Sequence, residues 1–108
     1  MNLSGNDLSG PQFSSVCNLL ISNKRLRHLS LADCNLETLA ADTIGTGMSK
    51  NTALHLLDIS DNKFGVDSFK QWPQKCLKGL RTLRTLDVSK NPWLGAHDIY
   101  NLLLCFKN

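Results

Sequence analysis

The chain has 108 residues, of which 42% are hydrophobic, and a formal net charge of +3. This length fits one domain or part of one, and the apolar content is typical of a globular protein. No apolar run approaches the roughly 18 residues that a membrane-spanning helix needs, and Met1 leads directly into patterned sequence, so neither a membrane partner nor a signal peptide is expected. The mild charge does not favour a nucleic-acid partner.

The four cysteines are spread along the chain without a C-x-x-C pair: Cys17, Cys34, Cys76 and Cys105. This spacing is typical of neither a zinc site nor a disulfide framework. We expect reduced cysteines that pack as small apolar residues, which favours a reducing compartment and a cytoplasmic protein.

A repeat organises the whole chain. Apolar residues and one Cys or Asn recur at places 1, 4, 6, 9 and 11 of each unit: Leu26, Leu29, Leu31, Cys34 and Leu36, then Leu54, Leu57, Ile59, Asn62 and Phe64, then Leu83, Leu86, Val88, Asn91 and Trp93. The units start 28 and 29 residues apart, and Met1, Leu3, Asn6 and Leu8 fit places 4 to 11 of a unit before them. The sequence therefore predicts one domain of four units, approximately 1–25, 26–53, 54–82 and 83–108, each opening with a short strand.

The first two units each predict a helix after the strand. Residues 11–22 begin with a proline suited to a first helical turn and continue with apolar residues at helical spacing. The second helix is expected from Glu37 and Thr38 to about Ser49, with Leu39, Ile44 and Met48 facing inward. Its two glycines weaken it by about 1 kcal/mol each, so packing must stabilise it.

The last two units are less alike. Val66, Phe69 and Trp72 have helical spacing, but Pro73 predicts that this helix stops or kinks near Trp72, followed by a short turn over residues 74–79. A final helix is expected over residues 96–106, with Phe106 among its apolar residues. We expect Trp72 and Trp93 to pack in the core or at its edge, the alternative being an exposed aromatic anchor for a partner.

The pattern L-x-x-L-x-L-x-x-(N/C)-x-L resembles leucine-rich repeats, and periods of 28 and 29 resemble their ribonuclease-inhibitor-like subclass. This resemblance implies an α/β fold, a right-handed solenoid with a curved parallel sheet on its concave side and helices on its convex side. Because no polar capping unit is visible, we expect a fragment of a longer array whose ends stack on further repeats.

The ninth place predicts a structural ladder. Asn6, Asn62 and Asn91 are expected to point inward just after each strand, where an amide can both donate to and accept from backbone groups of the turn. Cys34 at the same place can form only a weak version of these hydrogen bonds.

Partner-binding residues are expected on the concave face of the strands and the turns after them: Arg27, His28, Ser30, Asp33, His55, Leu56, Asp58, Asp61, Arg84, Asp87 and Lys90. Asp58 and Asp87 should lie about 5 Å apart on neighbouring strands and repel each other. A basic partner side chain would relieve this repulsion, which makes the pair a candidate anchor. Alternatively, these carboxylates are solvated and neutralised by nearby basic side chains.

A basic stretch is expected on the convex side, formed by Lys70, Lys75, Lys78, Arg81 and Arg84. These side chains would contact an acidic protein or RNA, or they are solvated and contact no partner. No nucleophile elbow, metal-type histidine spacing or phosphate-binding glycine loop is present in the sequence. We therefore expect no enzyme, no metal and no cofactor.

The sequence favours a non-enzymatic module that binds a protein partner, within a larger regulatory or scaffold protein. By subclass the chain resembles ribonuclease inhibitor, the sensor ends of NOD-like receptors, GTPase-activating proteins for Ran, and the actin-regulating tropomodulin and CARMIL proteins. The resemblance carries over no functional residue. Alternatives are a structural segment of a larger assembly, or a regulatory part of a GTPase-activating or actin-regulating protein.

Overall fold

The computed structural model describes residues 1–75 and 77–105, without the side chains of residues 77–79. Its elements in chain order are the 3-10 helix η1 (Pro11–Phe13), α1 (Ser14–Ser22), β1 (His28–Ser30), α2 (Thr38–Met48), β2 (Leu56–Asp58), α3 (Trp72–Lys75), α4 (Leu77–Thr82), β3 (Thr85–Asp87) and α5 (Ala96–Cys105). Within the described residues, no helix is both long and apolar enough to cross a bilayer.

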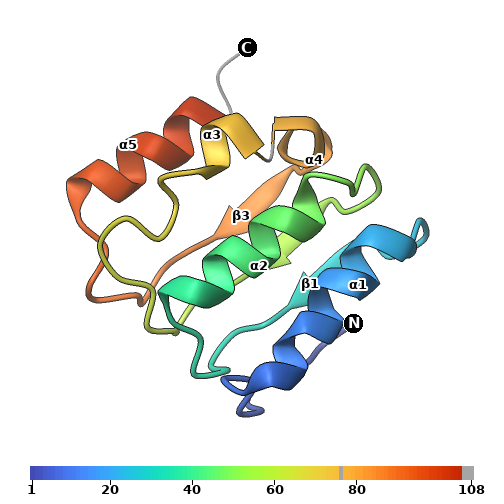
Figure 1. The fold of residues 1–108 in the computed structure, drawn as a ribbon, viewed down its shortest axis with the longest axis horizontal. Helices are drawn as coiled ribbons and strands as arrows, with labels where there is room; N and C mark the ends of the chain where they lie inside the picture. Colours follow the sequence, from blue (N-terminus) through green and yellow to red (C-terminus); the bar gives the residue numbers. More distant parts are fainter. Residues whose placement is uncertain (76, 106–108) are drawn as a thin grey trace.

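The three strands form one parallel sheet in the order β1-β2-β3, and helices form a second layer over one of its faces (Figure 1). Parallel neighbours need a crossover connection, and a helical segment supplies it between each pair of strands. The register pairs Leu29 with Leu57 and Leu57 with Leu86, which are the same place in three successive units. A single bridge from Asn2 to Ser30 adds the first unit to the sheet. The structure thus has the register that the repeat predicts.

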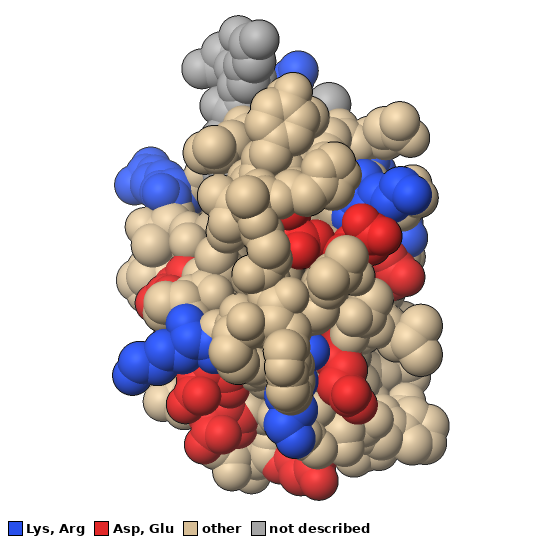
Figure 2. All heavy atoms as spheres, turned by 90° about the vertical axis from the view of Figure 1, so that its left-hand side faces the viewer, with Lys and Arg blue, Asp and Glu red and all other residues tan. Residues whose placement is uncertain are grey.

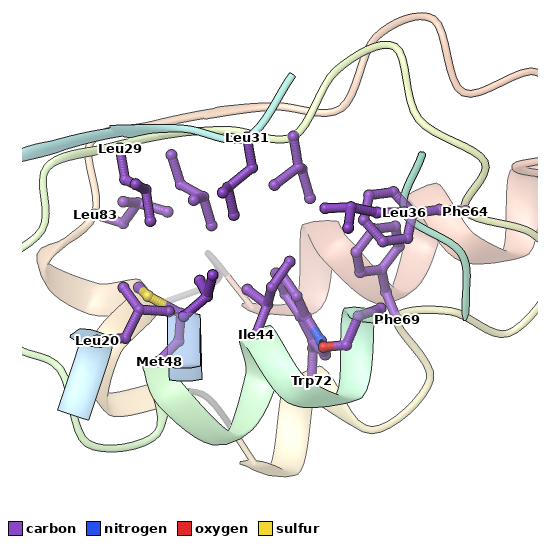
Figure 3. Packing of buried hydrophobic residues seen from close by; sticks show 14 of the residues in the cluster. Leu20, Leu29, Leu31, Leu36, Ile44, Met48, Phe64, Phe69, Trp72 and Leu83 are labelled. Carbon is purple, nitrogen blue, oxygen red and sulfur yellow. The ribbon is translucent and has the colours of Figure 1, made fainter. Parts of the chain in front are cut away.

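The core lies between the sheet and the helices (Figure 3). The sheet side of the core is formed by fully buried side chains of β1, β2 and the residues just after these strands: Leu29, Leu31, Leu57 and Ile59. Side chains from α1 and α2 meet them from the other layer, among them Leu20, Ile44 and Met48. Places 4 and 6 of the second and third units are therefore core positions, as the sequence predicted, whereas Leu86 and Val88 of the fourth unit are half-buried and Met1 of the first unit is 53% exposed.

Helices α1 and α2 pack so closely that one position requires glycine. A Cβ atom added to Gly47 would lie 2.8 Å from both Cβ and Cδ1 of Leu20. Real Cβ atoms almost never approach another carbon this closely, so a larger residue would push the two helices apart. Gly47 weakens the isolated helix but permits this contact.

The expected inward orientation of Leu39 is wrong, because its side chain is 81% exposed. The buried residues of α2 include Ala41, Ile44 and Met48, which lie three or four positions apart on one side of the helix. Leu39 precedes Ala41 by two positions, and at about 100° per residue it lies on the opposite side. Leu39 therefore borders solvent rather than the core.

The helix expected to end near Trp72 is also absent. Residues 66–71 form turns, and α3 instead begins at Trp72, with Pro73 in its first turn. Proline is favoured there because its missing N–H would have had no helical partner. Asp98 of α5 holds these turns in place, since its Oδ1 accepts a hydrogen bond from the Asp67 backbone N–H at 2.8 Å. Its Oδ2 accepts a hydrogen bond from the backbone N–H of Gly95, just before α5, at 3.0 Å.

The two tryptophans differ. Trp72 is fully buried, its ring centroid lies 4.7 Å from that of Phe69, and its Nε1 donates a hydrogen bond to the Ala41 carbonyl at 3.0 Å. Trp93 is 58% exposed, so it is not a core residue, and both packing at the edge of the core and the alternative of an aromatic anchor for a partner stay predictions for it. Cys76, expected in the short turn over residues 74–79, and Phe106, expected in the final helix, lie outside the described residues.

The described cysteines are free thiols, of which Cys34 and Cys105 are buried and Cys17 is half-buried. Burial raises the pKa of the Cys105 thiol to about 11 and also raises the pKa of Cys34. A thiol with a raised pKa stays neutral near pH 7 and packs as an apolar group.

Candidate functional site: the strand face and its two edges

Six residues form the outward side of the sheet, and we call them the strand face: His28, Ser30, Leu56, Asp58, Thr85 and Asp87. They lie in two rows across the three strands, one pairing His28, Leu56 and Thr85 and the other pairing Ser30, Asp58 and Asp87. All six are half-buried or exposed, whereas Leu29 and Leu57 between them are fully buried. This alternation follows from the strand geometry, which sends successive side chains to opposite faces.

The two carboxylates of the strand face lie side by side, as the register predicted. Each also closes the turn after its own strand: Asp58 Oδ1 accepts a hydrogen bond from Ser60 N–H, and Asp87 Oδ1 accepts one from Ser89 N–H, both at 2.9 Å. The Ser89 hydroxyl donates a further hydrogen bond to Asp87 Oδ1 at 2.7 Å. These Ser89 hydrogen bonds lower the pKa of Asp87, so it stays ionised at neutral pH.

The predicted basic residues at the second place also come together, and we call Arg27, His55 and Arg84 the basic row. Their backbones are linked directly, because His55 N–H donates to the Arg27 carbonyl and Arg84 N–H donates to the His55 carbonyl, both at 2.7 Å. Partial burial, followed by the positive charges of Arg84 and Arg27 and by His28, lowers the pKa of His55. The basic row lies where the strands begin.

Asp33, Asp61 and Lys90 were expected among the partner-binding residues of the concave face and the turns after the strands, and they occupy sharp turns at the edge opposite the basic row. Their φ angles are 53°, 55° and 56°, and Gly5 at the same place has 79°. They line a hollow of about 580 Å³ together with Asn35, Lys63 and Trp93. The leucine pattern does not reveal this left-handed position, although Gly and Asp at one place of successive units are a signal for it.

The ninth-place asparagines join neighbouring units. Asn62 Oδ1 accepts hydrogen bonds from the backbone N–H groups of Cys34 and Leu36, each at 3.0 Å. Its Nδ2 donates to the carbonyls of Leu31, Ile59 and Ser60 at 2.9, 3.1 and 3.0 Å. Asn91 repeats the arrangement one unit later, accepting from Phe64 N–H at 3.3 Å and donating to three carbonyls. Both side chains therefore satisfy backbone groups that would otherwise be buried without partners.

The other two members of the ladder differ. Cys34 Sγ donates weakly to the carbonyls of Leu3 and Ala32, at 3.2 and 3.4 Å. Asn6 is exposed, so its expected inward orientation is wrong, and its Nδ2 donates to Leu3 at 2.9 Å. Asn6 lies in the first unit, where none of the other described units covers its outer side.

A second asparagine pair, Asn23 and Asn51, stabilises the loops before β1 and β2. Asn51 Oδ1 accepts from the backbone N–H groups of Ala53 and Leu54, each at 2.9 Å, and its Nδ2 donates to the Leu20 carbonyl at 2.7 Å. Asn23 Oδ1 likewise accepts from Arg25 and Leu26. Asn recurring 28 residues apart was the available signal.

In the part of the chain that the structure describes, no group of three His, Cys, Asp or Glu side chains is arranged to hold a metal ion. A second hollow, of about 550 Å³, lies between the starts of α1 and α2 and includes the exposed Leu39. Of the basic stretch expected on the convex side, Lys70, Lys75, Arg81 and Arg84 are exposed, and the Lys78 side chain lies outside the description.

Two family models match, both described as leucine-rich repeats, at residues 25–46 and 79–97. These matches support a leucine-rich repeat protein, and the matched segments include β1 and β3 with the residues that follow them. No curated protein sequence matches the chain.

Two solved structures have a similar fold. The tropomodulin C-terminal domain from Caenorhabditis elegans is 12% identical with a TM-score of 0.80, over 97% of this chain and 64% of that one. Leiomodin-1 Actin-Binding Site 2 is 15% identical with a TM-score of 0.77, over 95% of this chain and 62% of that one. This chain thus spans less than two thirds of either neighbour, and at these identities the likeness shows the fold alone.

Proposed function

We propose that this chain is a non-enzymatic, cytoplasmic recognition module that binds a protein partner through its strand face. The observation that carries the proposal is the strand face itself: six accessible side chains in register on a parallel sheet whose turns are held by Asn62 and Asn91. A rigid, preformed surface loses little conformational entropy on binding, which favours recognition.

We further propose that the units form a segment of a right-handed solenoid of the ribonuclease-inhibitor-like subclass, with more repeats stacked on α5. Ile99, Tyr100 and Leu103 of α5 are 42%, 57% and 65% exposed. Figure 2 looks onto the side where α5 lies, and uncharged residues occupy most of the upper middle of that side. A further unit would bury such apolar surface, as neighbouring units do within the chain.

Actin is the first partner class to test. One of the two similar structures is named for an actin-binding site. The other is a domain of tropomodulin, one of the actin-regulating proteins that this chain resembles by repeat subclass. The carboxylates of Asp58 and Asp87 would then serve as an anchor for Lys or Arg of the partner, because a basic side chain between them relieves their mutual repulsion.

The test is co-sedimentation with filamentous actin and fluorescence binding to monomeric actin, comparing Asp58→Asn/Asp87→Asn with wild type. Asparagine keeps the oxygen that accepts from Ser60 and Ser89, so the turns should survive while the charge is lost. Glu37→Gln/Asp42→Asn, at two exposed positions just before and on α2, removes the same charge and is the matched control. We expect the double variant to bind about tenfold more weakly and the control to be unchanged.

Two outcomes would count against this function. If wild type binds neither form of actin, the partner class is wrong. If it binds and the double variant binds equally well, the partner does not use the strand-face carboxylates.

A further inference from the structure

We propose that the edge of the sheet where the strands begin binds an acidic protein segment rich in Asp and Glu. This inference goes beyond the proposed function, because it concerns a second surface with its own charge. We call this surface the return edge and define it by the segments 23–28, 49–55 and 80–85. They lie together at the upper right of Figure 1, at the ends of the strands opposite the turns that hold Asp33 and Asp61.

The return edge is basic throughout. None of its three segments contains Asp or Glu, and six exposed cations lie within them: Lys24, Arg25, Arg27, Lys50, Arg81 and Arg84. All nine acidic residues of the chain lie outside these segments. A formal net charge of +3 therefore conceals a concentration of positive charge at the return edge.

The basic row forms the centre of the return edge. Because the backbones of Arg27, His55 and Arg84 are hydrogen-bonded in sequence, their Cα positions are separated by about the 4.8 Å spacing of strands. The row therefore spans about 10 Å, which is the length of about three extended residues. A short acidic segment lying across the strands can reach all three side chains at once.

The backbone of the return edge is already ordered for binding. Asn51 ties the loop before β2 to the end of α1, through its hydrogen bond to the Leu20 carbonyl at 2.7 Å. Arg27 donates from its guanidinium to the Lys24 carbonyl at 3.2 Å, and the Lys24 ammonium donates to the Ile21 carbonyl at 3.0 Å. A partner would therefore meet cations whose loops need not reorganise, which keeps the entropic cost of binding low.

The charges on the return edge repel one another. The pKa of His55 is lowered by its partial burial and then by Arg84, Arg27 and His28, which shows that a further positive charge is unfavourable there. A carboxylate placed over the row would reverse this effect, since it attracts all of these groups. The electrostatics favour an anionic partner.

A protein segment fits better than a nucleic acid. Proteins that bind single strands combine cations with aromatic side chains on which bases stack. The three return segments contain no Phe, Trp or Tyr. The exposed Trp93 lines the hollow at the opposite edge, and Tyr100 lies on α5. The return edge therefore offers cations without a stacking surface.

The experiment measures fluorescence anisotropy with a labelled peptide of alternating Glu and Ser, its Gln-substituted analogue, and a single-stranded RNA of equal net charge. Arg27→Gln/Arg84→Gln removes two cations from the basic row. Lys63→Gln/Lys90→Gln removes two cations from the opposite edge and so has the same net charge. Circular dichroism confirms that each variant is folded.

We expect wild type to bind the Glu peptide but not the Gln peptide, the arginine variant to bind about tenfold more weakly, and the lysine variant to stay within about twofold. Equal losses in both variants would show a response to net charge alone and would overturn the proposal. RNA binding tighter than the Glu peptide would assign the edge to nucleic acid and overturn it too. Failure to bind any probe refutes the return edge but leaves the strand-face assay with actin unaffected.

Discussion

Replacing Asn62 by alanine tests how the units are joined. The Asn62 side chain is 4% exposed and makes hydrogen bonds with five backbone groups in two neighbouring units. Alanine would leave the N–H groups of Cys34 and Leu36 and the Leu31 carbonyl without this partner. Because these groups are buried beside the core, water can replace the amide only if the turn opens.

The expected cost follows from those contacts. Removing one partner from a buried polar group costs about 1–3 kcal/mol, and relaxation lets some of the groups recover hydrogen bonds. We therefore expect Asn62→Ala to lower the free energy of unfolding by about 3–5 kcal/mol, a large fraction of the roughly 5–15 kcal/mol that stabilises a typical domain.

Urea unfolding followed by circular dichroism measures this change. Asn6→Ala is the matched control, because Asn6 occupies the same place of the first unit but is exposed and makes one hydrogen bond, so its loss should cost about 0.5 kcal/mol. Asn62→Cys should cost less than Asn62→Ala, since Cys34 shows that a thiol fits this place and forms weak hydrogen bonds. Equal costs for the alanine variants of Asn62 and Asn6 would refute the ladder as a source of stability.

Three further predictions concern single residues. Gly47→Ala should destabilise by about 1–2 kcal/mol in urea unfolding despite alanine's helix propensity, because its Cβ would lie 2.8 Å from atoms of Leu20, and a stabilised variant would contradict the packing. Lys90→Asn should stabilise by about 0.5–1 kcal/mol, since Lys90 has a φ of 56° that Asn tolerates better, whereas Lys63→Asn, at a position without positive φ, should not. The pKa of the Cys105 thiol is about 11 in the folded state and about 8.5 in the unfolded state. Its contribution to the free energy of unfolding is therefore fully present below about pH 8.5 and is lost as the pH rises to about 11. The stability difference between wild type and Cys105→Ala should therefore shrink over that range, and a constant difference would exclude this linkage.

The repeat predicted the sheet because the same apolar pattern recurs in successive units at a nearly constant period. A slip of one residue would move Leu29 and Leu57 to the solvent face, so the apolar pattern and the 28-residue period together specify the register. The third unit was mispredicted because Val66, Phe69 and Trp72 have helical spacing that tertiary contacts override. Asp98, 31 residues from Asp67, holds those turns, and no local pattern reveals such a contact.

The strand face was predictable because the repeat specifies the register of the strands, whereas the two edges of the sheet were predictable only in part. The rows Ser30–Asp58–Asp87 and Arg27–His55–Arg84 follow from the register alone. The left-handed turns at Asp33, Asp61 and Lys90 need backbone angles that the leucine pattern does not encode, and these turns carry the three side chains away from the strand face.

Hydrogen–deuterium exchange on the protein mixed with actin tests the central proposal most directly, because it identifies the face that the partner covers. We predict slower exchange in peptides covering residues 27–31, 55–59 and 84–88, with no change in α1 or α2. Protection confined to the helices, with the three strand segments exchanging as in the free protein, would contradict recognition through the strand face.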